Sequence, residues 1–349
     1  MRAKLIIKYE DTGAKMKRQL MILTVITAIL LVGITACKKK AKPETTLRKV
    51  RVVLDWTPNT NHSGLYVAQG LGYYKEKGLE VEILQPGENT VEKIIASDQA
   101  EFGVSYQESV TIARSENIPV KSIAAIIQHN TSGFASLKSA NIISPKDFEG
   151  KRYGSSGWPS ELEILRQVME SYDADYKKVQ IVYGITDFFS TIGRDADFEW
   201  IYYGWDGVQA KLRGIELNYI PVRDLDPVFD FYTPVLIAND QLLNSDPELV
   251  RDFLEATSKG YEYCVQNPES AAEIFWKAVP ELDKNLVKAS LNYLKTEFIS
   301  DASQWGLQDF SVWQRFADWM YQKHIIQKSL KAQELFTNEF LPNATHTKS

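Results

Sequence analysis

Five aromatic side chains fall where a predicted strand turns into a predicted helix, and they lie outside the spacing of a helical core. They are Trp56, Tyr106, Trp158, Tyr203 and Trp205. Rings in such loops hold flat heteroaromatic molecules by offset stacking, which contributes about 0.5–1.5 kcal/mol per pair beyond the area buried. For any one of these rings, packing inside or on the surface of the protein is the alternative. Together they indicate a site for a planar ligand.

Two carboxylates accompany these rings. Asp206 follows Trp205 in the sequence YYGWDG, and Glu161 ends the sequence SSGWPSE. A carboxylate in a dry cleft accepts charge-assisted hydrogen bonds from an amino group or a protonated ring nitrogen. Two structural roles remain open, because Glu161 lies in the first turn of a predicted helix and Asp206 precedes a helix that it can cap.

Motifs for catalysis or metal binding are missing from the sequence. The four histidines (His62, His129, His324 and His346) are scattered, and no nucleophile elbow, phosphate-binding loop or dinucleotide fingerprint occurs. We therefore expect a binding protein without catalytic residues, cofactor or metal, rather than an enzyme.

The aromatic loop nearest the N-terminus follows a buried strand, Val50–Leu54. Pro58 ends this strand because it cannot donate to a sheet. Asn61 or Ser63 then caps a helix over residues 63–77. Trp56 is thus placed between the carboxyl end of a strand and the start of a helix, which is where open α/β sheets bind ligands.

Residues 16–37 have the pattern of a bacterial lipoprotein signal peptide. A basic start precedes thirteen mostly apolar residues, too few to span a bilayer comfortably, and Ile34–Cys37 matches a lipobox. We predict a signal peptide over residues 1–36 and lipidation of Cys37, with an ordinary secretory signal or a short anchor helix as the alternatives. Residues 1–15 lack this pattern, and Met16 is the expected start.

The segment that follows, 37–47, is a basic tether suited to anionic lipid headgroups. Without residues 1–36 the formal net charge of −5 becomes more negative, which disfavours nucleic acid as a partner. The remaining cysteine, Cys264, lies in a helical segment and is expected to be an inert core residue.

The rest of the chain alternates strand and helix in two stretches, which predicts two α/β domains with mainly parallel sheets and a helical C-terminal third. We expect the chain to leave the first domain near residue 135 and to return near residue 233. The first-domain strands are predicted at Val50–Leu54, Leu79–Leu84, Phe102–Ser105 and Val120–Ile127, and those of the second at Arg152–Gly154, Val179–Tyr183 and Trp200–Tyr203.

Three separated motifs resemble the extracytoplasmic binding lipoproteins for thiamine pyrimidine precursors. They are the segment from Leu54 to Ile83, YYGWDGVQAKLRGIELNYI, and LFTNEFLP at residues 335–342. This family also contains the fungal enzymes that make the thiamine pyrimidine, and the resemblance covers about residues 48–342.

The resemblance implies a two-lobed periplasmic-binding-protein fold of type II, with two hinge crossings. Lobe 1 would comprise residues 48–135 and 233–342, lobe 2 residues 136–232, and a tail residues 343–349. It also implies a monomer, anchored outside the cytoplasm to the cell membrane, that delivers a formylated aminopyrimidine or hydroxymethylpyrimidine to the permease and ATPase subunits of an ABC transporter.

Carried over by position, the resemblance also implies the site residues. Lobe 1 would contribute Trp56, Asn61, His62 and Tyr106, and lobe 2 would contribute Ser155, Trp158, Glu161, Tyr203, Trp205 and Asp206. The family commonly has Glu where this chain has Asp206, which is one methylene shorter.

The synthase alternative fails on the sequence. The fungal enzymes carry a lysine for pyridoxal phosphate and a histidine consumed as substrate, and these positions align with Ser105 and Ser109 here. Their cysteine cluster aligns with residues 229–233, which contain no cysteine. Another planar or small cargo, such as riboflavin, a nucleobase or a sulfonate, remains the alternative within the same fold. A sulfonate would require Arg or Lys in the pocket loops.

Overall fold

The computed structural model describes residues 16–17 and 46–343. Cys37, almost all of the predicted signal peptide and most of the predicted tether lie outside these residues, so the lipid anchor stays a prediction. The compact unit that holds the rest of the chain begins at Leu47. Within the described ranges, no helix combines the length and apolar character needed to cross a bilayer.

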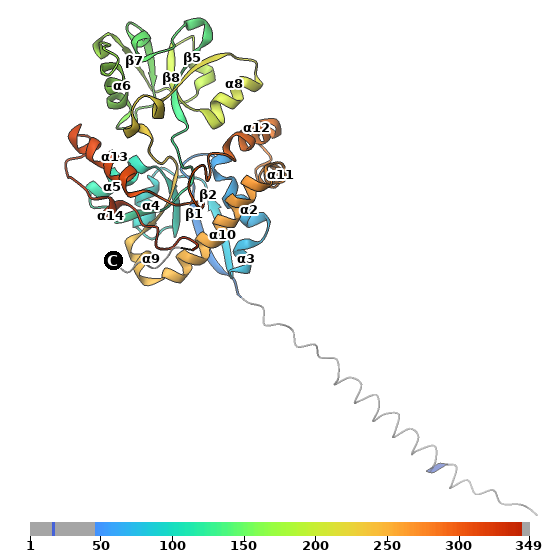
Figure 1. Ribbon diagram of the computed structural model, residues 1–349. Helices are drawn as coiled ribbons and strands as arrows, with labels where there is room; N and C mark the ends of the chain where they lie inside the picture. The colour runs from blue at the N-terminus through green and yellow to red at the C-terminus, as the bar shows by residue number, and fades with distance from the viewer. Residues whose placement is uncertain (1–15, 18–45, 344–349) are drawn as a thin grey trace, which may run out of the picture. The chain divides into compact units, whose positions relative to one another are not determined.

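Within the described residues, ten strands form two five-stranded sheets, which confirms the two-lobed α/β fold (Figure 1). Sheet A, in lobe 1, has the order β2-β1-β3-β10-β4, with bounds β1 Arg48–Val53, β2 Leu79–Leu84, β3 Phe102–Ser105, β4 Val120–Ala125 and β10 Val235–Asn239. Sheet B, in lobe 2, has the order β7-β6-β8-β5-β9, with bounds β5 Ser132–Leu137, β6 Arg152–Ser155, β7 Gln180–Tyr183, β8 Phe198–Tyr202 and β9 Leu217–Pro221.

Both sheets are mixed, so the expectation of mainly parallel sheets was wrong. In sheet A, β1 is parallel to β2 and β3, whereas β10 is antiparallel to β3 and β4. In sheet B, β6 is parallel to β7 and β8, whereas β5 is antiparallel to β8 and β9. The chain enters β5 and β10 directly from the other sheet instead of through a helical crossover, and only such a crossover keeps neighbouring strands parallel.

Each sheet carries its own helices, as Figure 1 shows. The helices of lobe 2 are α6 Glu161–Glu170, α7 Phe188–Thr191 and α8 Val208–Leu212. Those of lobe 1 are α2 Ser63–Gly70, α3 Tyr73–Glu76, α4 Val91–Ala96, α5 Gln107–Ser115, α9 Asp240–Ser245, α10 Pro247–Gln266, α11 Pro268–Ala278, α12 Lys284–Leu294, α13 Phe310–Gln322 and α14 Ala332–Leu335. The predicted helical C-terminal third is therefore confirmed.

The chain crosses between the sheets twice, at residues 126–131 and 222–234. The first crossing ends earlier than the expected boundary near residue 135, because β5 already belongs to sheet B. The sequence of β5, SGFASL, is rich in small residues and lacks the β-branched side chains that are typical of strands. The other domain boundaries stay predictions.

A hydrogen-bonded cluster joins the two crossings. Asp230 accepts from the backbone N–H of Asn130 at 2.9 Å and faces Nδ1 of His129 at 2.7 Å. The other ring nitrogen of His129 lies 3.1 Å from a carboxylate oxygen of Asp301. Both ring nitrogens must donate to carboxylates, so this geometry favours the imidazolium form. Hydrogen bonding to Asp230 raises the pKa of His129 to about 9 despite partial burial.

Helices α2 and α10 pack at very short range beneath sheet A. Helix α10 begins at Pro247, after Asp246 has capped its amino end, and buries an apolar stripe that includes Phe253 and Tyr261. Gly260 makes the close approach possible, since a Cβ there would meet the backbone oxygen of Gly64 at 2.1 Å. The buried thiol of Cys264 lies in the same core, and burial raises its pKa, as expected of an inert residue.

We predict that Gly260→Ala destabilises the protein. The added methyl group overpacks the contact with α2, which typically costs about 1–3 kcal/mol and more than offsets the roughly 1 kcal/mol gained in helix propensity. Thermal unfolding followed by circular dichroism measures the change. Gly87→Ala is the control, because no atom lies within 4 Å of a Cβ at that position. Equal midpoints for the two variants would contradict the close packing of α10 against α2.

His129 contributes to stability in a pH-dependent way. Its pKa in the folded protein, about 9, lies above the usual value near 6.5. The stabilisation is therefore complete below about pH 6.5 and is lost as the pH rises through about 9. We expect His129→Gln to lower the melting temperature most at pH 6 and little above pH 9.5. A pH-independent difference between variant and wild type would show that the imidazolium plays no part.

Candidate ligand-binding cleft

A cleft of about 470 Å³ lies between the two sheets, beyond the carboxyl ends of β1, β3, β6 and β8. Ligands of open α/β sheets bind in such a position. Loops from both lobes line the cleft, and Phe231 and Thr233 of the second crossing add to it. Its volume is within the range of small-molecule sites.

Aromatic rings form much of the lining. They are Trp56, Tyr106, Trp158, Phe188, Trp200, Tyr202, Trp205 and Phe231. Trp158 and Trp200 meet edge to face, with ring centroids 4.9 Å apart and an interplanar angle of 81°. Trp56 remains 51% exposed, although it is a large apolar side chain. An exposed indole at the mouth of a concave site is a surface on which a ligand ring can stack.

A chain of hydrogen bonds from His62 fixes Tyr106. Nδ1 of the fully buried His62 accepts from the backbone N–H of Asn59, so Nε2 carries the proton and donates to Asp55 at 2.6 Å. The other oxygen of Asp55 accepts from the Tyr106 hydroxyl at 2.5 Å. Burial alone would raise the pKa of Asp55, but these partners lower it. His62 thus acts on the cleft through Tyr106 and does not line it.

Glu161 holds the loop that carries Trp158. Its buried carboxylate accepts from the hydroxyls of Tyr153 at 2.7 Å and Ser155 at 2.9 Å, and from the backbone N–H of Gly157 at 2.8 Å. These bonds use the carboxylate internally. Neither Glu161 nor Ser155 lines the cleft. Glu161 and Ser155 therefore support the loop from behind, and Trp158 is the residue of the loop that lines the cleft.

The segment Tyr203–Gly207 forms a single π-helical turn, η5, between β8 and α8. Such turns often occur at functional sites. The turn directs Trp205 and Asp206 into the cleft, while the ring of Tyr203 packs against Tyr219, with centroids 4.7 Å apart. Asp206 accepts from the backbone N–H of Tyr202 at 3.2 Å. Burial raises the pKa of the Asp206 carboxyl to about 6.

Three further carboxyl groups line the cleft, and sequence reasoning missed them: Glu108, Asp187 and Glu199. Burial raises the pKa of Glu108 to about 7 and that of Glu199 to about 8. Glu108, in lobe 1, accepts from the backbone N–H of Ser160 in lobe 2 at 2.8 Å. Among the described residues that line the cleft, none is a lysine, arginine or histidine.

Half of the ten predicted site residues line the cleft. They are Trp56, Tyr106, Trp158, Trp205 and Asp206. The other five lie behind it, where they shape the loops: Asn61, His62, Ser155, Glu161 and Tyr203. Asn61, for example, contributes its backbone oxygen, which accepts from Tyr261 at 2.8 Å. A signal for Glu199 and Trp200 existed in the sequence, because both are on the strand that leads into YYGWDG.

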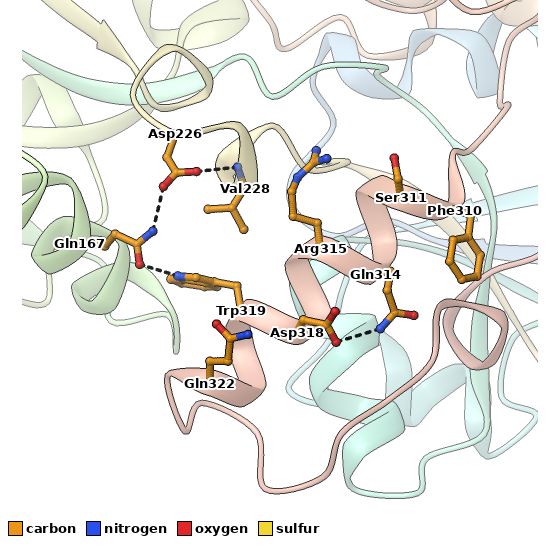
Figure 2. Close-up of a pocket in the computed structure, with 10 residues that line it drawn as sticks. All are labelled: Gln167, Asp226, Val228, Phe310, Ser311, Gln314, Arg315, Asp318, Trp319 and Gln322. Atoms are coloured by element: carbon orange, nitrogen blue, oxygen red, sulfur yellow. Dashed lines mark hydrogen bonds between the residues drawn. The ribbon is translucent and has the colours of Figure 1, made fainter.

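A second, shallower hollow of about 640 Å³ lies between α13 of lobe 1 and α6 of lobe 2 (Figure 2). One hydrogen bond across the hollow joins the lobes. The indole N–H of Trp319 donates to Gln167 at 2.8 Å, and Gln167 donates to Asp226 at 3.0 Å. Trp319 belongs to the buried core. Two aromatic rings line the hollow, against eight in the cleft, and its lining includes a cationic side chain, Arg315.

Comparison with known proteins agrees with this architecture. The chain is 28% identical to the formylaminopyrimidine-binding protein of Halalkalibacterium halodurans, over 91% of this chain and 98% of the relative. It is 26% identical to the 4-amino-5-hydroxymethyl-2-methylpyrimidine phosphate synthase of Legionella pneumophila, over 86% of this chain and 94% of the relative.

Among solved structures, the periplasmic aliphatic sulphonate binding protein SsuA from Escherichia coli superposes with a TM-score of 0.66. The alignment covers 86% of this chain and 96% of SsuA at 12% identity, so it supports the fold alone.

The NMT1/THI5 like family matches residues 59–271, which contain the lobe 1 loop with His62, the π-helical turn and α10. This match spans more than half of the 349 residues. The protein therefore belongs to the NMT1/THI5-like family.

Proposed function

We propose that the protein is the extracytoplasmic solute receptor of an ABC transporter and that its cargo is a thiamine-type aminopyrimidine. The observation that carries this proposal is the cleft itself, which combines aromatic rings with carboxyl groups between two lobes. Rings stack on a flat heterocycle, and carboxylates accept from its amino group. The relative named a formylaminopyrimidine-binding protein supports the same class of ligand.

The charge of the lining argues against an anionic cargo. Four carboxyl groups and no cationic side chain surround the cleft, as far as its described lining goes. A sulfonate or a phosphorylated pyrimidine would be repelled, and its desolvated charge would lack a partner. Similarity in fold to SsuA therefore does not extend to its ligand. Riboflavin and nucleobases carry no such charge and stay the alternative cargoes.

A pyrimidine synthase is the other function that a relative's name suggests. The two positions that resemble the catalytic lysine and histidine of the fungal enzymes are serines in this chain. Ser105 is buried and its hydroxyl donates to Glu92, while Ser109 lines the cleft. A serine hydroxyl cannot form the imine that holds pyridoxal phosphate, so we propose binding without catalysis.

In this proposal, the lipid on Cys37 keeps the receptor at the outer face of the cell membrane, since acyl chains supply the anchor. Closure of the lobes around the cargo would present a defined surface to the permease, and the ATPase subunits would drive uptake. The receptor would work as a monomer. Mass spectrometry of the membrane-extracted protein tests the anchor, because acylation adds a mass that Cys37→Ser abolishes.

Stacking on two of the indoles that line the cleft, Trp56 and Trp205, predicts the effect of removing them. We expect Trp56→Ala and Trp205→Ala each to weaken binding of 4-amino-5-hydroxymethyl-2-methylpyrimidine about tenfold, because a lost aromatic pair is worth about 1 kcal/mol in addition to the area it buries. Isothermal titration calorimetry on the purified protein measures the affinity.

Tyr183→Ala is the matched control, because this ring is 68% exposed on the edge strand β7 and does not line the cleft. Unchanged affinity in both tryptophan variants would mean that the cargo binds elsewhere. If the wild-type protein binds riboflavin and no aminopyrimidine, riboflavin replaces the aminopyrimidine as the cargo.

A further inference from the structure

The carboxyl group of Glu199 lies at the floor of the cleft without a complete set of hydrogen-bond partners. The residue is only 2% exposed, and its Oε1 makes no hydrogen bond within the part of the chain that the structure describes. It nevertheless belongs to the lining of the cleft. Leaving a buried carboxyl oxygen unpaired is costly, and a ligand group would remove that cost.

Sheet B provides room for this side chain. Glu199 is on β8, and its cross-strand neighbours are Gly154 on β6 and Ala135 on β5. A Cβ at position 154 would come within 2.7 Å of Cγ of Glu199. The small neighbours on both sides therefore let the carboxyl group occupy the interior, and any larger residue at position 154 would displace it.

Two more carboxyl groups belong to the same part of the cleft. Asp206 lies on the π-helical turn and Asp187 at the start of α7, and both act electrostatically on Glu199. No cationic side chain among the described lining residues balances this charge. Neighbouring carboxyl groups disfavour one another's ionised forms, whereas a bound cation would favour the ionised form of all three. The recess is thus complementary to a positively charged group with several N–H donors.

We propose that Glu199, together with Asp187 and Asp206, binds the ammonium group of the cargo. Building on the proposed function, the preferred ligand is then the pyrimidine with a free aminomethyl group, 4-amino-5-aminomethyl-2-methylpyrimidine. Its N-formyl and hydroxymethyl counterparts carry no such charge and bind more weakly. Glu199 is the residue that determines this preference, since it is the most deeply buried of the three acids.

Protonation equilibria support the proposal. Burial is the main cause that raises the pKa of Glu199 to about 8, and Asp187, Asp206 and Asp195 raise it further. The phenol of Tyr153 on β6 also interacts with this carboxyl. At pH 7 most Glu199 side chains are therefore protonated in the empty cleft. An arriving ammonium group would lower the pKa, so that binding releases a proton into the buffer.

Calorimetry on the wild-type protein tests the preference directly. We expect the aminomethyl ligand to bind at least tenfold more tightly than the formylated and hydroxymethyl ligands at pH 7.5. Its apparent enthalpy should also differ between phosphate and Tris buffers, because these buffers take up the released proton with different enthalpies. Equal or tighter binding of the formylated ligand would overturn the ammonium site and leave the proposed aminopyrimidine receptor intact.

Variants assign the effect to Glu199. Glu199→Gln keeps the shape and should lose at least tenfold in affinity for the aminomethyl ligand, lose the buffer dependence, and change little for the hydroxymethyl ligand. Asp187→Asn, at an exposed position on the rim, should lose about threefold without affecting the fold. Glu170→Gln, exposed at the end of α6, is the control for overall charge and should bind like the wild type.

The outcomes separate the two proposals. Wild-type affinity of Glu199→Gln for the aminomethyl ligand, with the thermal midpoint unchanged, means that Glu199 does not bind the ammonium group. If that variant is unstable, the buffer dependence of the wild type and the loss in Asp187→Asn decide instead. If no aminopyrimidine binds the wild-type protein in any form, the proposed function itself fails.

Discussion

The position of β10 in the middle of sheet A is the constraint on which the architecture depends. This strand lies between β3 and β4 although more than a hundred residues separate it from β4 along the chain. Lobe 1 is therefore incomplete until lobe 2 has been made and the chain has returned. The two crossings must run side by side, and the bonds from Asp230 to His129 and Asn130 join them. The cleft opens at this junction because the strand ends that face it belong to both sheets.

Support and contact are divided between different residues in the cleft. Two of the aromatic residues are supported by a buried polar residue: Tyr106 by His62 by way of Asp55, and the loop of Trp158 by Glu161. A buried carboxylate with several donors fixes its loop more firmly than apolar packing can, since each bond has a defined direction. The rings therefore face the cleft in set orientations before any ligand arrives, and less ordering remains to be done on binding.

Much of this arrangement could be predicted from the sequence. The strand Leu79–Leu84, in which apolar residues alternate with glutamate, has the bounds that its pattern indicates. Strand β5 was missed because small residues gave no signal, and β9 because Pro221 ends it at the edge of the sheet. For the site, residue type identified the rings, but it could not distinguish a carboxylate that faces the cleft from one that faces a loop. Glu161 in α6 faces its own loop, whereas Glu199 in β8 lines the cleft, and long-range packing determines this difference.

The bond between Glu108 and the amino end of α6 couples lobe separation to proton release. While the lobes are together, this carboxyl of lobe 1 accepts from Ser160 at the start of a lobe 2 helix, and burial keeps its pKa near 7. Moving the lobes apart would return the acid to water, where its proton is released more readily. Low pH would then favour the closed form and high pH the open form, even without cargo. In a receptor at the cell exterior, where the pH varies, the equilibrium between the closed and the open form would therefore depend on pH.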